Sequence, residues 1–175
     1  MDHIAAQAVG LLATALGVVS LQCKHPRSLL LCQMSGNVAF VIHYLMLGAY
    51  TACVGQVILI FNILMICGKS DAKARWKGWK WVFSILSLVT CIATWQDRFS
   101  ILPCAASLVT ILTNWSFHGM TIRLGKLCLS CPGWIIYDIH VGSYSGILCE
   151  LIAMGSALLA ILRYHSNAPQ KTDTL

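Results

Sequence analysis

Seven long apolar segments, separated by short polar stretches, make up most of the chain. They cover roughly residues 4–22, 28–47, 51–67, 80–95, 101–117, 122–141 and 145–163. Apolar and polar side chains do not alternate in them, so the segments are typical of helices rather than strands. A helix needs about 20 apolar residues to cross a bilayer, and backbone polar groups in lipid must be satisfied within helices or closed barrels. We therefore expect an all-α polytopic membrane protein with seven transmembrane helices.

The composition argues against a water-soluble domain. The chain is 58% hydrophobic and 10% charged, which is more apolar surface than a soluble fold of 175 residues can bury. The first apolar segment also lacks the positively charged stretch that precedes the core of a secretory signal, since Asp2 is acidic. We interpret this segment as a retained first span.

The basic residues are distributed unequally between the two sides of such a bundle. Of the 12 Lys and Arg residues, all but Arg98 fall in the first, third and fifth loops or on the C-terminal side. By the positive-inside rule this places the N-terminus outside and the C-terminus in the cytoplasm, and it requires an odd number of spans. Orientation in the bilayer thus accounts for the net charge of +6, and we expect no nucleic-acid partner.

Nine cysteines are scattered along the chain, most of them inside apolar segments. A free cysteine in such a segment acts as a small hydrophobic residue. Cys128 and Cys131 form a CxxC pair, but it lies within a span, and no second pair with the spacing of a zinc site accompanies it. We therefore expect no metal and no cofactor.

The first and last thirds of the chain resemble each other in plan. When the sequence is moved by 94 positions, the three segments of residues 1–67 superpose on those of residues 101–164, and Gly48-Ala-Tyr50 falls on Gly142-Ser-Tyr144. Few residues are identical, so the matched boundaries are the stronger support. This predicts two parallel three-helix repeats within one chain or paired across a homo-oligomer.

The remaining residues connect the repeats or follow them. Residues 68–100 are predicted to hold a basic cytoplasmic loop and a linker helix, and residues 165–175 a disordered cytoplasmic tail. A 3+1+3 plan with parallel repeats is that of SWEET transporters, whose sites lie between the repeats. The Pro-Gln pair of those proteins is absent from the apolar segments, and no proline precedes Gln22.

Two carboxylates, Asp138 and Glu150, lie within apolar segments. An ionisable group inside a span is costly, usually faces the bundle interior, and is a functional hypothesis by default. When the two repeats are superposed as above, polar residues of the first repeat fall on the part of the second repeat that holds Asp138 and Glu150. The resulting candidate substrate-binding cluster, in the outer half of the membrane, contains His43, Tyr44, Gln56, Tyr137, Asp138 and Glu150. The alternative is that these residues only hold helices together.

Other polar and small residues have simpler interpretations. Asn62, Asn114 and Trp115 are expected to form hydrogen bonds between helices. The small residues Gly10, Ala13 and Gly17, spaced by three and four positions, indicate close helix packing rather than a phosphate-binding loop. Arg27 and Arg123 begin spans on the cytoplasmic side, as topology requires.

Two classes of function remain open from these observations. The first is a small-solute transporter, with proton coupling as one form of it, that uses the polar cluster as its site. The second is a non-transporting membrane protein that binds a protein or lipid partner. An enzyme is not expected, because no nucleophile, metal set or glycine-rich phosphate loop accompanies the two acids.

Several short motifs agree in order and spacing with one known family. Residues 43–51 read HYLMLGAYT, similar to a family pattern of His followed by a Leu-rich LLGAY segment. Further matching positions are Gln33, Asn37, Leu102, Pro103, Arg123, Trp134, Tyr137, Gly142, Ser143, Gly146 and Glu150. Together they resemble the YgjV-type bacterial inner-membrane proteins from about residue 8 to residue 164. The chain departs from the family at Asn62, where a basic residue is expected, and at Asp138, where Asn is usual. The resemblance implies a bacterial inner-membrane location and no particular reaction.

Overall fold

A computed structural model describes residues 3–23, 25–68, 78–116 and 118–166 of the chain. Within these ranges the regular structure is entirely helical. The α-helices are α1 (His3–Gln22), α2 (Pro26–Met46), α3 (Tyr50–Gly68), α4 (Gly78–Ala93), α5 (Ile101–Asn114), α6 (Gly119–Gly125), α7 (Cys131–Val141) and α8 (Tyr144–Ser166). A 3-10 helix, η1 (Arg98–Ser100), precedes α5, and a π-helix, η2 (Lys126–Ser130), joins α6 to α7 without a break.

Each predicted apolar segment coincides with a helix, which confirms the all-α fold class. The segment at 122–141 corresponds to the continuous run of α6, η2 and α7. Three helical stretches are long and apolar enough to cross a membrane, namely His3–Ser20, Arg27–Met46 and Tyr50–Gly68. Shorter apolar stretches are Gly78–Ala93, Arg98–Asn114 and Tyr144–Leu159. The count of seven spans stays a prediction. The basic loop around residues 69–77 and the tail from residue 167 lie outside the described residues.

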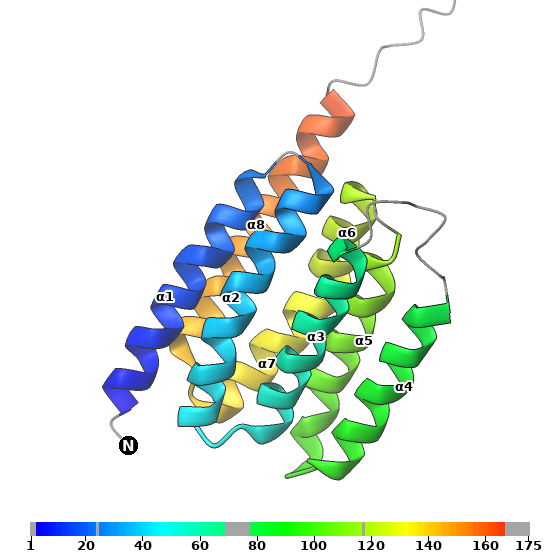
Figure 1. Ribbon diagram of the computed structural model, residues 1–175. Coiled ribbons are helices and arrows are strands. Elements are labelled where there is room, and N and C mark those ends of the chain that lie inside the picture. Colours follow the sequence, from blue (N-terminus) through cyan, green and yellow to red (C-terminus); the bar gives the residue numbers. More distant parts are fainter. Residues whose placement is uncertain (1–2, 24, 69–77, 117, 167–175) are drawn as a thin grey trace, which may run out of the picture.

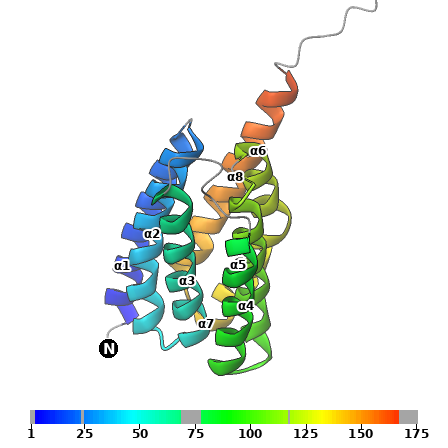
Figure 2. The same ribbon diagram turned by 45° about the vertical axis from the view of Figure 1, so that its right-hand side comes forward.

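The helices form a bundle in which the first and last helices are neighbours. Helix α1 packs against both α2 and α8, and α8 packs in turn against α7. Helix α3 packs between α2 and α5, so the two halves of the chain meet at α1–α8 and at α3–α5. Helix α4 contacts α3 and α5 at the edge of the bundle, as both views show (Figure 1, Figure 2).

The outer surface of this bundle is apolar. Large hydrophobic side chains are exposed on helices from both halves, including Ile4 (84% exposed), Ile92 (73%) and Leu129 (62%). A monomeric soluble protein rarely exposes such continuous apolar surface. Lipid chains solvate it without cost, so the surface fits a membrane-embedded bundle.

The same turn occurs twice in the chain, with a spacing of 94 residues. Gly48 (φ 71°) and Gly142 (φ 70°) both adopt the left-handed conformation that glycine tolerates best. In the first turn the backbone N–H of Ala49 donates to Tyr44 O, and in the second that of Ser143 donates to Asp138 O, at 2.9 and 2.8 Å. Each turn therefore ends one helix and starts the next in the same way.

Small residues allow α1 and α2 to approach closely, as the sequence predicts. A Cβ atom added at Gly36 would lie 3.4 Å from Ala13 O and from Gly17 N, so the two backbones are nearly in contact there. At Gly10 the added atom would collide with the side chains of Ser145 and His43. The spacing of small residues on α1 thus brings α2 and α8 against it at van der Waals distance.

Candidate functional site

A cavity lies between the two halves of the bundle, with residues of α1, α2, α3, α5, η2, α7 and α8 in its wall. Its volume is about 60 Å³. One water needs about 10–15 Å³ by this measure, so the cavity holds roughly four to six water-sized groups. The polar residues lining it are Ser20, Gln33, Asn37, Gln56, Thr110, Lys126, Ser130 and Glu150.

Three amide side chains in this wall carry polar atoms without a protein partner. These atoms are Oε1 of Gln33, Nδ2 of Asn37 and Oε1 of Gln56. Their residues are only 7%, 8% and 7% exposed, respectively. A buried polar atom without a hydrogen bond costs free energy, and native proteins leave few of them. The cavity is therefore built with hydrogen-bonding capacity that the fold itself does not use.

Two opposite charges share the cavity. Lys126, the first residue of η2, and Glu150 of α8 both line it. Glu150 has Lys126 and the thiol of Cys131 as its interacting neighbours. Lys126 and Glu150 nevertheless make no ion pair. The ion pair found within the described ranges joins His140 and Asp97, on the surface. The charges therefore face the cavity without touching each other.

A second polar group is fully buried beside the cavity. The Nδ1 atom of His43 lies 2.7 Å from the carbonyl oxygen of Ala6, and the Nε2 atom lies 2.8 Å from Oγ of Ser143. A carbonyl oxygen only accepts, so Nδ1 carries the proton, and in the neutral ring Nε2 accepts from the Ser143 hydroxyl. Asp138 also belongs to this buried group, and its Oδ1 atom accepts a hydrogen bond from the Tyr44 hydroxyl at 2.8 Å.

Ser143 is the centre of this buried group. Its Oγ atom also accepts from the backbone N–H of Gly146, at 3.2 Å. The second carboxyl oxygen of Asp138 lies beside the same hydroxyl but accepts no well-aligned bond, because the serine proton is directed to His43. A side chain at Gly146 would fill the space between the two groups, so glycine is required at that position.

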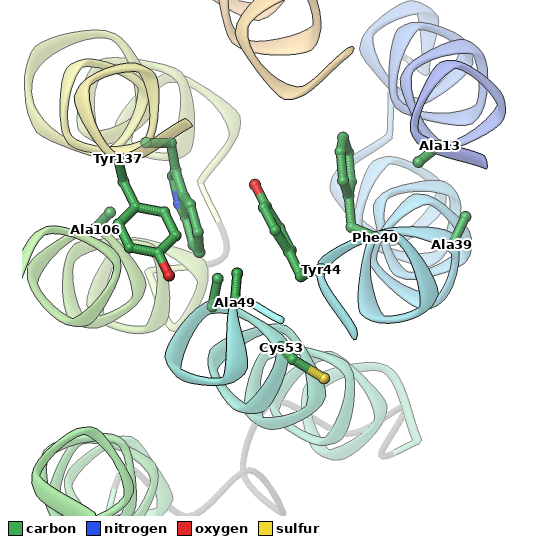
Figure 3. Close-up of a cluster of buried hydrophobic side chains, with 10 residues drawn as sticks. Ala13, Ala39, Phe40, Tyr44, Ala49, Cys53, Ala106 and Tyr137 are labelled. Carbon is green, nitrogen blue, oxygen red and sulfur yellow. The ribbon is translucent and has the colours of Figure 1, made fainter. Parts of the chain in front are cut away.

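Aromatic rings separate the buried group from the cavity. The ring of Tyr44 stacks on Phe40 with centroids 5.7 Å apart and on Trp134 with centroids 5.8 Å apart. Phe40 and Trp134 line the cavity, whereas Tyr44 does not. In Figure 3 the Tyr44 ring stands in the middle of the bundle beside Phe40. Its hydroxyl group points away from α3, and Asp138 is the residue that receives its hydrogen bond.

Five of the six predicted candidate residues thus occupy two neighbouring sites. Gln56 and Glu150 line the cavity, and His43, Tyr44 and Asp138 belong to the buried group. Tyr137 is buried in the hydrophobic cluster that contains Tyr44 and Trp134, and its ring centroid lies 6.3 Å from that of Trp134. On α8 the residue that faces Asp138 is Gly146. Glu150 follows four positions later, about 6 Å along the helix axis.

Sequence reasoning left Gln33, Asn37, Lys126 and Ser143 out of the candidate set. Gln33 and Asn37 appeared only among the motif positions. Lys126 was assigned to a loop by the charge count, although it falls inside the predicted segment at 122–141. That position within an apolar segment is the signal that identifies it as a lining residue. Ser143 carries no such signal, because small hydroxyl residues are common in membrane helices and turns.

None of the nine cysteines, all of which lie within the described residues, takes part in a disulfide. Of the CxxC pair, Cys128 is exposed whereas Cys131 is buried. No group of three or more His, Cys, Asp or Glu side chains that could hold a metal ion occurs among the described residues.

An all-helical bundle with an apolar outer surface and polar groups enclosed in its interior defines an α-helical membrane protein. The chain belongs to the Imp-YgjV family, described as bacterial inner membrane protein, whose sequence profile matches residues 4–168. The match confirms the resemblance that the motifs indicate and places the protein in the bacterial inner membrane. Searches of curated proteins and of solved structures gave no match.

Proposed function

We propose that this inner-membrane protein is a small-solute transporter whose site is the cavity between the two halves. The observation that carries the proposal is the set of unpartnered polar atoms on Gln33, Asn37 and Gln56 around that cavity. A bound polar solute would satisfy these atoms and offset their cost of burial. Without a solute, these three atoms lie in the cavity wall without a protein partner. Binding and passage of a solute, rather than catalysis, is the activity we propose.

The proposed architecture is seven spans in a 3+1+3 plan, with α4 as the linker. The repeated turn at Gly48 and Gly142 supports two equivalent halves. Transporters built from repeats bind substrate where the repeats meet, and the repeats move against each other to expose the site on either side. The cavity has a wall from both halves, which fits such a movement.

The proposed orientation follows from charge. The segregation of Lys and Arg places the N-terminus outside and the C-terminus in the cytoplasm. On this orientation η2 and Lys126 approach the cavity from the cytoplasmic half, and the turn at Gly142 lies on the outer side. The proposal includes two arrangements, one chain alone or two chains paired as a homo-oligomer. The mass of the detergent-solubilised particle distinguishes them.

Thermal unfolding of the purified protein in detergent, against a broad panel of small solutes, tests the proposal. A ligand that binds only the folded state raises the unfolding midpoint. We expect at least one polar solute to raise the midpoint of the wild type, to do so less in Glu150→Gln, and to enter proteoliposomes that contain the protein. Asp97→Asn is the matched control, because it makes the same type of change on the surface.

Failure is equally specific. If no solute shifts the midpoint and no solute enters the proteoliposomes, the transporter proposal is wrong. A protein or lipid that co-purifies with the chain would then favour the second hypothesis, a membrane protein that binds a partner. A shift that is identical in the wild type and Glu150→Gln would place the solute elsewhere than in this cavity.

A further inference from the structure

We propose that the solute is a small zwitterion, with its cationic group at Glu150 and its anionic group at Lys126. This inference rests on the proposed function, because it names the class of solute for the same cavity. It is carried by the charges, the unpartnered amides and the size of the cavity.

The two charges are close enough to share the cavity and too far apart to neutralise each other. Both side chains line it, and the electrostatic influence of Lys126 reaches Glu150. The ammonium and carboxylate groups are nevertheless further apart than the 4.0 Å of an ion pair. Charges withdrawn from water are stable only when each has a partner. A zwitterion placed between them gives each its partner at the same time.

Other classes of solute fit this charge pattern less well. An anion would pair with Lys126 and place a like charge near Glu150, and a cation would do the reverse. Either would leave the loaded cavity with a net charge in a low-dielectric environment, which is costly. An uncharged solute leaves both charges without a partner. A zwitterion is neutral overall, so the cavity carries the same total charge empty and loaded.

The unpartnered amide atoms complement the same ligand. Oε1 of Gln33 and Oε1 of Gln56 are acceptors, and an ammonium group offers donors only. Nδ2 of Asn37 is a donor, and a carboxylate offers acceptors only. The cavity thus holds free hydrogen-bonding groups of both kinds, in addition to one charge of each sign.

The size of the cavity fits a small ligand. Its volume of about 60 Å³ is space for a few water-sized groups, since one water needs about 10–15 Å³. Glycine and alanine are zwitterions of this size. Phe40 and Trp134 in the wall also suit a cationic head group, because ammonium ions are attracted to aromatic faces.

Binding of alanine and its charge-modified derivatives tests the inference. The probes are glycine and alanine, N-acetylalanine (an anion), alaninamide (a cation) and glycerol (uncharged), measured by calorimetry on the full chain in detergent. We expect glycine or alanine to bind, and both charged derivatives to bind at least about tenfold more weakly, because each loses one charge-assisted contact.

Substitutions then assign each charge. Lys126→Gln is expected to weaken alanine binding by about tenfold to a hundredfold and to reduce the preference for alanine over alaninamide. Glu150→Gln is expected to weaken alanine binding by a similar factor and to reduce the preference for alanine over N-acetylalanine. Lys80→Gln is the matched control, since its ammonium lies over Trp81 outside the cavity. If either cavity variant does not fold, Lys126→Arg or Glu150→Asp takes its place, because each keeps the charge and changes the length of the side chain that carries it.

The outcomes separate this inference from the proposed function. Binding of glycerol but not of glycine or alanine would overturn the zwitterion and leave the transporter proposal intact. Equal affinity for alanine and either derivative would also overturn it. If none of these probes binds and the broad solute panel gives no midpoint shift, both proposals fail together.

Discussion

The hydroxyl group of Tyr44 donates a hydrogen bond of 2.8 Å to Oδ1 of Asp138, and the two residues are 94 positions apart. This is the same spacing that separates the two glycine turns. On the predicted repeat, Tyr44 and Asp138 are matched positions of the two halves, and the hydrogen bond joins them across the bundle. Equivalent positions related by a two-fold axis make direct contact only near that axis. The pair supports an axis through the centre of the bundle.

Removing the Tyr44 hydroxyl tests how much this contact contributes. Tyr44→Phe leaves Oδ1 of the buried Asp138 without its donor, so we expect the free energy of unfolding to fall by about 1–3 kcal/mol. Denaturant titration in detergent measures the change. Tyr50→Phe is the control: that tyrosine is 54% exposed and should change stability by less than about 0.5 kcal/mol. Equal effects in both variants would contradict the interpretation.

Ser143→Ala removes the hydroxyl that connects His43 to the second half. The change leaves Nε2 of His43 and the N–H of Gly146 without their partner. The expected loss is about 1–3 kcal/mol of unfolding free energy. Ser35→Ala, which removes an exposed hydroxyl bonded only to Cys32 O, provides the comparison in the same assay. A stability loss no larger in Ser143→Ala than in Ser35→Ala would show that the hydrogen bond to His43 contributes little.

Two glycines of α8 should respond in opposite ways to alanine. A Cβ atom at Gly146 would collide with Asp138 and Ser143, whereas one at Gly155 would meet nothing within 4 Å. We expect Gly146→Ala to destabilise the protein by about 1–3 kcal/mol through overpacking. Gly155→Ala should be neutral or stabilise it by up to about 1 kcal/mol, because alanine favours the helix. Comparison of the two unfolding midpoints checks both, and equal midpoints would remove the packing argument.

The surface pair of Asp97 and His140 predicts a pH dependence. The hydrogen bond from His140, at 2.6 Å, lowers the pKa of Asp97, and the backbone N–H groups of Phe99 and Ser100 add to this effect. The carboxylate therefore contributes stability above its unfolded-state pKa of about 3.9. This contribution disappears as the pH falls through the lower folded-state pKa.

We expect the unfolding midpoint of the wild type to decrease more steeply below about pH 4 than that of Asp97→Asn. The difference should be small, because both side chains are more than a third exposed and solvent screens the interaction. Unfolding curves at closely spaced pH values measure it. Parallel pH profiles of the two proteins would show that Asp97 does not contribute through this pair.

Hydropathy and turn chemistry predicted the course of the chain well. The apolar segments coincide with helices, and α2 ends at Met46, two residues before the left-handed Gly48, because length and local conformational preference are properties of the sequence itself. The depth of a polar residue along a helix is also readable in this way. All six candidate residues lie inside the bundle, because polar side chains of membrane helices face the bundle interior. Glu150 lies about 6 Å further along α8 than Gly146, which faces Asp138.

The division of those six residues into a cavity and a buried group was not predictable. It depends on the rotation of each helix about its axis, and the nearly uniform apolar faces of α1, α2 and α3 specify no rotation. The stacking of Tyr44 between Phe40 and Trp134 decides which side each polar group faces. Such contacts join residues distant in sequence and leave no periodic signal.

The π-helix η2 acts as a spacer that keeps one side of its helix in line. Lys126, Ser130 and Trp134 follow one another at intervals of four residues, and all three line the cavity. Along an α-helix each such step overshoots a full turn by about 40°, so the third residue would turn away from the first. The wider turn of η2 offsets this drift over its length. Regular α-helix over the same eight steps would turn Lys126 by about 80° relative to Trp134, which would take the cation out of the cavity without altering a single residue that lines it.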